Sequence, residues 1–358
     1  MNEIMLPEMD DIQVSEEKEI KDKQPFAIKM AFLGTGQGGC KLAQTFGSLG
    51  FARVAGVNTT DKDVVGDLPL YLMEGFDGAG KNPAKGKEAA EEYKSDILEF
   101  CHEKFGSDTE YLFICVGAGG GTGTGSTTTL IQVAKDYFTA LRKPVRVGVI
   151  ATIPRDTEGS QVFGNAVNLL DELCDKAVAR EIAPLILIDN KKIASMFSKV
   201  VSMKDFWTVA NKNACSMFSI FNLLANQRSE YETFDKKDFE SVLDSGIITF
   251  GTTRVPDYDS VTGISKAIRK NLENGLFATG FDFSSATCVA AMLAANPNVL
   301  GTMPADAMEH SVKTLQSVLH PRLTIHRGVY EVTNKALFLY TMIGGLAKPE
   351  ERLNELKV

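Results

Sequence analysis

The sequence lacks several features that would each assign it to a different class of protein. No apolar run approaches the ~20 residues that a membrane-spanning helix needs, so membrane insertion is not expected. An excess of basic residues is also missing, since the net charge is -8. Nonspecific affinity for nucleic acid depends on clustered Lys and Arg. Any role on DNA would therefore require a basic partner.

Paired cysteines are also absent. The six cysteines are scattered, with no CxxC pair and no His nearby at metal-ligand spacing. We interpret them as reduced, buried, small apolar residues, which favours a cytoplasmic location. The N-terminus has no basic segment before an apolar core, so a signal peptide is not expected.

The chain does have the length and composition of a large globular protein. Its 358 residues are 44% hydrophobic and 23% charged. Single hydrophobic cores stop growing at about 250–300 residues, so two subdomains are expected. The first 24 residues stand apart, because residues 1–23 hold eight acidic side chains against three lysines. Met5, Met9 and Ile12 fall on one helical stripe, which fits a short docking helix; a disordered charged tail is the alternative.

From residue 25 to residue 202, expected strands alternate with expected helices. Such alternation predicts βαβ units and a parallel sheet covered on both faces. The apolar runs that predict the strands lie at 28–33, 53–57, 111–116, 145–153 and 184–188, and the helical patterns between them lie at about 84–105, 123–141 and 160–181.

A long apolar periodicity over 203–231 predicts a central helix, assigned with the following loop to residues 203–234. Residues 235–346 then predict a smaller mixed α/β domain, with helices at 258–275 and 304–319. Its last two expected strands, 322–332 and 336–344, are separated by a short turn and predict an antiparallel hairpin. Residues 347–358 are predicted to form a short C-terminal helix or tail.

The most informative segment is the glycine-rich run at 117–126, which follows the expected strand 112–116 and opens a helix. Six glycines in ten positions allow successive N–H groups to converge on an anion, and the helix adds its unpaired N-terminal N–H groups. Thr122, Thr124 and Ser126 offer hydroxyls to phosphate oxygens. No Lys follows the last glycine, so this is not a Walker loop.

Residues 119–126 resemble the GGGTGTG/S signature loop of the tubulin/FtsZ superfamily. The resemblance implies a tubulin/FtsZ-like α/β fold, with a Rossmann-like parallel-sheet GTPase domain, a long central helix and a smaller mixed α/β C-terminal domain. It also implies binding of GTP or GDP with Mg²⁺, whose ligands the sequence does not indicate. The signature residues expected at the phosphates are Gly119, Gly120, Gly121, Thr122, Gly123 and Thr124.

Further loops resemble the nucleotide-binding loops of the same superfamily. The segments 34–40, 58–61 and 78–83 are similar to its first, second and third loops. Glu158, which matches a ribose-binding Glu, has an exposed surface acid as its alternative interpretation. The residues expected to bind nucleotide from the three loops are Gly36, Gln37, Gly38, Asn58, Gly80, Lys81 and Asn82.

Recognition of guanine is predicted from amide and aromatic side chains. Asn190 follows the strand at 184–188, and an amide can both donate to and accept from guanine. Trp207 and Asn211 are four residues apart, hence on one helix face. The superfamily has an aromatic residue and Asn at that spacing. A core Trp beside an exposed Asn is the alternative.

Residues 233–238 resemble the superfamily's synergy loop, NxDxxD, with Thr233 in place of its Asn. The resemblance makes Asp235 and Asp238 the expected catalytic residues, acting in the nucleotide site of the next subunit. An ordinary helix N-cap is the alternative. Hydrolysis on this plan requires assembly, and a head-to-tail contact that does not close gives a filament.

The compact C-terminus, acidic N-terminal segment and altered synergy loop resemble the TubZ branch of the superfamily. That resemblance implies partition of plasmid or phage DNA, with a DNA-binding adaptor of TubR type joining the filament to centromere DNA. Three alternatives stay open: an FtsZ-like division GTPase, a filament without efficient hydrolysis, and an NAD(P)-binding Rossmann oxidoreductase. The last rests on Gly34–Gly39 with Asp61, and leaves the richer glycine loop unexplained.

Overall fold

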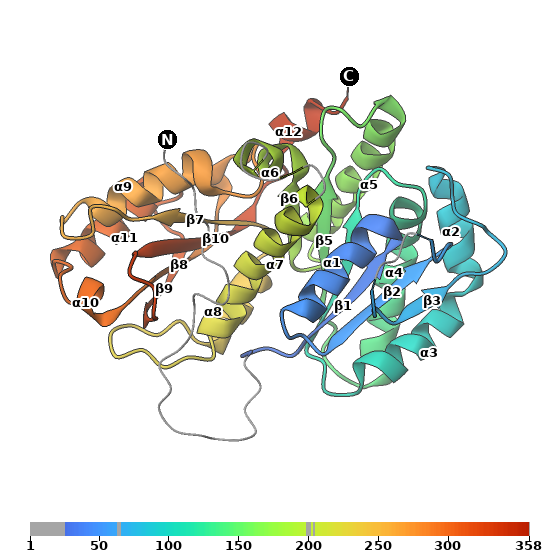
Figure 1. The fold of residues 1–358 in the computed structure, drawn as a ribbon, viewed down its shortest axis with the longest axis horizontal. Helices are drawn as coiled ribbons and strands as arrows, with labels where there is room; N and C mark the ends of the chain where they lie inside the picture. The colour runs from blue at the N-terminus through green and yellow to red at the C-terminus, as the bar shows by residue number, and fades with distance from the viewer. Residues whose placement is uncertain (1–25, 63–65, 198–201, 203–204, 358) are drawn as a thin grey trace. The chain divides into compact units, whose positions relative to one another are not determined.

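The computed structural model describes residues 26–62, 66–197, 202 and 205–357. Contacts divide the chain into two compact units (Figure 1). The larger unit comprises Ile28–Cys215 and the segment from Lys348 onward, and the smaller unit is built from Ser216–Ala347. The predicted helix or tail at 1–24 lies outside the described residues, and the predicted domain boundaries stay predictions.

The larger unit contains six parallel strands in the order β3-β2-β1-β4-β5-β6. The central strands are buried along almost their whole length, as expected for a sheet covered on both faces. The strands are β1 (Met30–Thr35), β2 (Arg53–Asn58), β3 (Leu70–Leu72), β4 (Tyr111–Gly117), β5 (Val147–Ile153) and β6 (Leu185–Asp189).

The connections of this sheet run in two directions from its centre. Helix α1 (Gly36–Ser48) connects β1 to β2, whereas α4 (Thr122–Ala140) and α5 (Ser160–Val178) lead the chain the other way, from β4 to β5 and β6. Because crossovers are right-handed, α1 lies on one face and α4 and α5 on the other (Figure 1). The direction reverses between β1 and β4, where the carboxyl ends of an open α/β sheet form a ligand-binding crevice.

Two predicted helices of this half differ in extent from the observed ones. The stretch predicted as one helix over 84–105 is divided at Tyr93 into α2 (Pro83–Glu92) and α3 (Lys94–Phe105). The central helix α7 (Phe206–Leu224) ends seven residues before the predicted limit of 231. Its apolar periodicity stops at Leu224, and the polar run Asn226–Ser229 that follows has no apolar face to bury.

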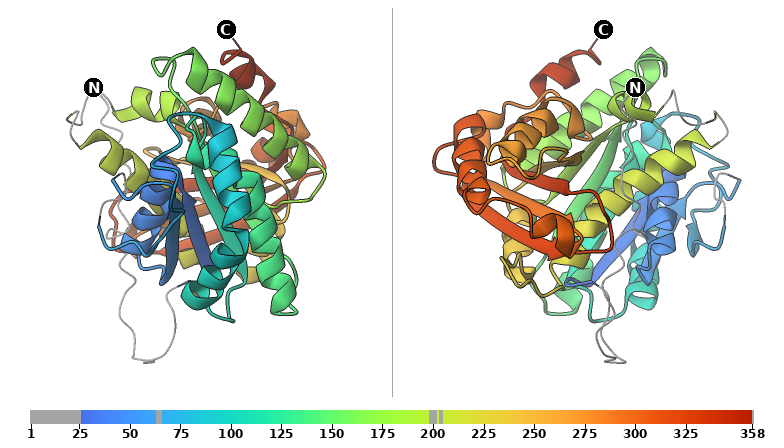
Figure 2. Two further views of the ribbon diagram at one scale, coloured as in Figure 1. Left: turned by 90° about the vertical axis from the view of Figure 1, so that its right-hand side faces the viewer. Right: turned by 60° about the vertical axis from the view of Figure 1, so that its left-hand side comes forward.

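The smaller unit contains four strands in the order β7-β10-β8-β9. Strand β10 (Phe338–Leu346) is antiparallel to β7 (Ile247–Arg254) and β8 (Cys288–Ala295), and β9 (Thr324–Glu331) is parallel to β8. Helices α9 and α11 lie side by side (Figure 2). The helical segments of this unit are α8 (Lys236–Leu243), α9 (Gly263–Lys270), η2 (Asn271–Gly275), η3 (Phe283–Ser285), α10 (Pro297–Leu300) and α11 (Asp306–Val318).

The predicted hairpin of 322–332 with 336–344 is wrong, because β8 lies between β9 and β10. Strand β10 is buried at eight of its nine positions, which suits an interior strand. Strand β9 is partly exposed over Thr324–Arg327, as an edge strand can be. The helix predicted over 258–275 also starts later, at Gly263, and finishes as the π-helical turn η2.

Edge strand β9 holds the segment that leads into α8. The Tyr330 hydroxyl donates to Phe234 O (2.8 Å) and accepts from Phe234 N (2.9 Å). Val329 N donates to Glu232 O (2.9 Å), and Arg327 forms an ion pair with Glu232 (2.6 Å). Burial raises the pKa of Tyr330 to about 12, so its hydroxyl keeps its hydrogen at neutral pH. Phe234, the residue before Asp235, is therefore held by hydrogen bonds to both its N–H and its C=O.

Among the described residues, none of the helices is long and apolar enough to cross a membrane.

Tyr330→Phe is expected to destabilise the protein by about 1–3 kcal/mol, because it leaves a buried N–H and C=O of Phe234 unpaired. The matched control is Tyr231→Phe, since Tyr231 is 55% exposed and its hydroxyl makes only a 3.4 Å contact with Glu331. We expect the control to change stability by less than about 0.5 kcal/mol. Urea-induced unfolding measures the free energy of unfolding of both variants. Equal losses of stability would show that the Tyr330 hydroxyl does not hold Phe234 as described.

Candidate functional site

A cavity of about 680 Å³ opens in the larger unit at the carboxyl ends of β1 and β4. Its size falls within the range of about 300–1,000 Å³ typical of small-molecule sites. Fifteen of the residues predicted to bind nucleotide line it. They are Gly36, Gln37, Gly38, Asn58, Gly80, Lys81, Gly119, Gly120, Gly121, Thr122, Gly123, Glu158, Asn190, Trp207 and Asn211.

Two residues predicted to bind nucleotide, Asn82 and Thr124, are not among those that line the cavity. The Asn82 side chain accepts a hydrogen bond from Ala84 N (3.0 Å) and so caps α2. The Thr124 hydroxyl accepts from Gly119 N (2.9 Å), which holds the glycine loop from behind. Ser126, whose hydroxyl the sequence offered to phosphate, contacts the Thr35 hydroxyl instead (2.6 Å). A binding role for Asn82 and Thr124 stays a prediction.

The glycine loop between β4 and α4 forms one wall of the cavity. Gly119 has φ +104°, and a Cβ there would lie 2.4 Å from Cγ1 of Val162, so no other residue fits without displacing α5. Helix α4 begins at Thr122, and the N–H groups of its first turn have no intrahelical partner. The loop and this helix end together form a site suited to an anion.

Asn165 on α5 fixes the distance between two loops of the site. Its Nδ2 donates to Lys81 O (2.9 Å) and to Gly119 O (3.2 Å), and Gln161 Nε2 also donates to Lys81 O (3.3 Å). Lys81 adopts φ +60°, a left-handed conformation that these bonds help to hold. Asn165 was not predicted to belong to the site, since its only signal in the sequence is that it shares a helix face with Gln161.

The polar side chains of the cavity favour a negatively charged ligand at this end. Lys41 and Lys81 both line it. Lys41 was also missed, although it lies one helical turn after Gln37 on the same face of α1. Asn58 Oδ1 accepts from Thr59 N (3.0 Å), while its Nδ2 is buried and has no partner in the part of the chain that the structure describes. An unpaired buried donor facing a cavity fits a ligand that brings an acceptor.

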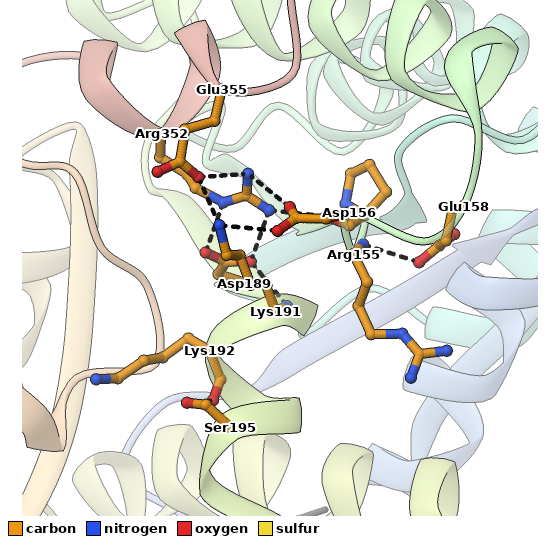
Figure 3. Close-up of polar contacts among 10 residues, drawn as sticks. Arg155, Asp156, Glu158, Asp189, Lys191, Lys192, Ser195, Arg352 and Glu355 are labelled. Atoms are coloured by element: carbon orange, nitrogen blue, oxygen red, sulfur yellow. Dashed lines mark hydrogen bonds and ion pairs between the residues drawn. The ribbon is translucent and has the colours of Figure 1, made fainter. Parts of the chain in front are cut away.

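Glu158, Asn190, Trp207 and Asn211 line the part of the cavity formed by the loop after β5 and by helices α6 and α7. Glu158 Oε1 accepts from Arg155 N (2.9 Å), which orients the carboxylate (Figure 3). The Arg155 guanidinium lies 4.8 Å from the ring centroid of Trp207. Asn190 is the first residue of α6 (Asn190–Phe197). This part of the cavity combines amides, an aromatic ring and one carboxylate, a set that suits a base and a sugar.

Asp235 and Asp238 lie in the smaller unit, at the start of α8. They form a capping box: Asp235 Oδ1 accepts from the N–H groups of Lys237 (2.7 Å) and Asp238 (3.0 Å), and Asp238 Oδ2 accepts from Asp235 N (3.1 Å). Asp238 Oδ1 also lies 2.8 Å from His326 Nδ1. The N-cap interpretation is therefore correct for Asp235, while catalysis stays a prediction. Within the described residues, the second carboxylate oxygen of Asp235 makes no hydrogen bond, whereas both oxygens of Asp238 are engaged.

Comparison with known proteins relates these features to one family. Residues 74–198 match the tubulin/FtsZ family, GTPase domain. The chain is 25% identical over 284 residues to the tubulin-like protein TubZ of Bacillus cereus, a match that covers 72% of this chain and 63% of that protein. The matched region thus spans less than two thirds of that relative.

Solved structures show the same fold. The chain resembles a GTPγS-form protofilament of TubZ from Bacillus thuringiensis serovar israelensis, with a TM-score of 0.79, 20% identity, and coverage of 92% of this chain and 90% of that one. It also resembles a type III plasmid segregation TubZ, with a TM-score of 0.74, 20% identity, and coverage of 93% and 91%. The predicted fold class and the predicted resemblance are confirmed. The chain is thus similar to the tubulin/FtsZ family over residues 74–198 and has a tubulin/FtsZ-like fold.

Proposed function

We propose that the chain binds GTP in this cavity and hydrolyses it to GDP and phosphate within head-to-tail filaments of its own subunits. The observation that carries the proposal is the cavity itself. A glycine loop and a helix N-terminus form its anion end, and two amides and a lone Trp form its base end. Its volume of about 680 Å³ is that of a small-molecule site and leaves room for more than a free anion.

At the base end, Asn190 and Asn211 select guanine, because an amide both donates to O6 and accepts from N1 or N2. Trp207 supplies a ring face for stacking, and the Glu158 carboxylate accepts from ribose hydroxyls. At the phosphate end, Lys41, Lys81 and the orphaned Nδ2 of Asn58 offset the negative charge. These contacts hold the triphosphate along the rim of β1 and β4.

Mg²⁺ fits this site as an ion held chiefly by the phosphates. The described part of the chain has no cluster of three His, Cys, Asp or Glu side chains that could hold a metal. When bound, the ion would neutralise charge on the phosphoryl group. Gln37 and Thr60 line the cavity, and their side-chain oxygens could ligate the ion there.

Hydrolysis is completed by the next subunit in the filament. Asp235 presents an exposed carboxylate with one oxygen free to accept a proton from water. The fold shared with protofilament structures supports head-to-tail assembly. Similarity to a plasmid segregation TubZ, together with the acidic net charge, supports movement of plasmid or phage DNA through a basic adaptor of TubR type that binds centromere DNA. Such a filament works in the cytoplasm.

GTP turnover per molecule is expected to rise sharply above a critical protein concentration, because each site lacks its carboxylates until a neighbour binds. Light scattering followed in the same samples should rise at that concentration, and ATP serves as the control nucleotide. Turnover proportional to protein concentration without scattering would contradict both assembly and the catalytic role of a neighbour.

Asp235→Asn is expected to reduce GTP turnover in filaments by about 10²-fold, because it removes the carboxylate that accepts a proton. Asn caps helices as well as Asp does, so the unfolding free energy should change by less than about 0.5 kcal/mol. Asp238→Asn should reduce turnover less, since both of its oxygens are already engaged.

The matched control for these variants is Asp282→Asn, because Asp282 also caps a helical turn of the smaller unit through Ser284 N (3.0 Å). If Asp235→Asn and Asp238→Asn both turn over GTP like the control, the carboxylates are only caps and the filament hydrolyses GTP by other groups.

Asn58→Asp is expected to raise the dissociation constant for GTP by at least about tenfold. The variant keeps the Oδ1 acceptor for Thr59 N but replaces a donor by a negative oxygen facing phosphate. Titration calorimetry measures the constant. The control Asn296→Asp is the same change at the cap of α10, where Oδ1 accepts from Val299 N (3.0 Å). If the two variants bind GTP with equal affinity, the triphosphate does not lie beside Asn58.

A further inference from the structure

The C-terminal helix α12 (Glu350–Asn354) inserts an arginine into the larger unit behind the cavity. Arg352 is 2% exposed and pairs with Asp189, which is 1% exposed. Its Nε donates to Asp189 Oδ2 (2.8 Å), and its Nη2 donates to Pro154 O (2.9 Å) and Asp189 Oδ1 (3.3 Å). Figure 3 shows the guanidinium at the centre of this group.

These contacts join two segments that carry lining residues of the cavity. Asp189 ends β6, and the next residue is Asn190. Pro154 follows β5, and the same loop continues to Glu158. One guanidinium therefore sets the separation between the predicted guanine-reading amide and the predicted ribose-binding carboxylate.

A second layer of charge surrounds the arginine. Its Nη1 donates to Glu355 Oε2 (3.1 Å), and Lys191 Nζ contacts both Asp156 and Glu355 at 2.9 Å. Burial disfavours the charged guanidinium, but the hydrogen bonds and charge of Asp189 more than offset it and raise the pKa of Arg352. The hydrogen bonds and charge of Asp156 and Glu355 likewise raise the pKa of Lys191. Arg352 and Lys191 therefore both stay charged at neutral pH.

Stability alone does not account for such a pair. Buried ion pairs cost desolvation, and apolar residues of similar volume often stabilise a fold as well or better. What an apolar residue cannot do is fix two loops by directed hydrogen bonds. Asp189 Oδ1 also accepts from Lys191 N (2.9 Å), so the carboxylate orients the first turn of α6, which begins at Asn190.

We propose that Arg352 is a positioning residue for guanine selectivity, acting through Asp189 and the Pro154 carbonyl on Asn190 and Glu158. This inference rests on the proposed function, because it assumes that guanine binds at this end of the cavity. It assigns the C-terminal segment a role in nucleotide choice although that segment supplies none of the residues that line the cavity.

The test compares dissociation constants for GDP and ADP, measured by calorimetry on the full chain, so that hydrolysis does not interfere. Arg352→Met should lower the preference for GDP by about tenfold or more, through weaker GDP binding. Arg352→Lys should recover part of the preference, because a single ammonium cannot hold the carboxylate and the carbonyl in the same geometry. Thermal unfolding is recorded for each variant.

Two further variants separate positioning from stability. Asp189→Asn combined with Arg352→Met removes the unpaired buried charge but keeps the acceptor for Lys191 N, so it should recover thermal stability without recovering the preference. Lys348→Met is the matched control. It also breaks an ion pair between the C-terminal segment and the larger unit, but with Asp171 on α5, and should keep the preference within about twofold.

Three results would overturn the inference. The first is an Arg352→Met protein that keeps the wild-type preference, the second is a Lys348→Met protein that loses as much preference as Arg352→Met does, and the third is a double variant that regains selectivity along with stability. A wild-type protein that binds GDP and ADP equally would instead refute the proposed function, and the inference with it. Failure of the proposed function would thus be seen in the wild-type protein, whereas failure of the inference would be seen only in the variants.

Discussion

Close approach of two backbone segments at the carboxyl ends of β1 and β4 is the constraint on which the rest of the site depends. A Cβ at Gly39 would lie 2.0 Å from Cys115 O, and one at Gly36 would lie 2.8 Å from Gly123 N. The first turn of α1 therefore packs directly on the backbone of β4 and its loop. Two helix N-termini are brought to one point in this way, and the anion end of the cavity results from that contact.

The loops around this point are held by side chains that do not themselves line the cavity. Asn165 ties two loops together at the proposed phosphate end, and Arg352 does the same at the proposed base end. Each supporting residue makes hydrogen bonds to main-chain carbonyls of both loops or to a carboxylate beside them. Separating the groups that contact a ligand from those that fix the loops allows a rigid site to be built from irregular backbone.

The features that the sequence predicted well are local in the chain. The glycine loop at 119–126 lies between a strand and a helix that each show their own periodicity. Fifteen residues predicted from such loops and from the start of the central helix line one cavity. The features that were missed depend on residues far apart. Arg352 lies 163 residues from Asp189, and nothing in residues 347–358 indicates a buried arginine. The position of β8 between β9 and β10 likewise depends on which strand is buried on both faces. The short turn between β9 and β10 does not indicate that order.

At the start of α8, the structural role of one pair of residues is compatible with the chemistry proposed for them. A capping box immobilises Asp235 and Asp238, and Tyr330 fixes the peptide before them, so the carboxylates would lose little further freedom in the proposed contact with a neighbouring subunit. A general base that acts across an interface must be held in position before the interface forms, because any disorder would have to be removed at the moment of assembly. The absence of the usual Asn at Thr233 is compatible with this arrangement, since β9 rather than the loop itself supplies the restraint. The N-cap is thus the means by which the carboxylate of Asp235 is presented, and it does not compete with a role in hydrolysis.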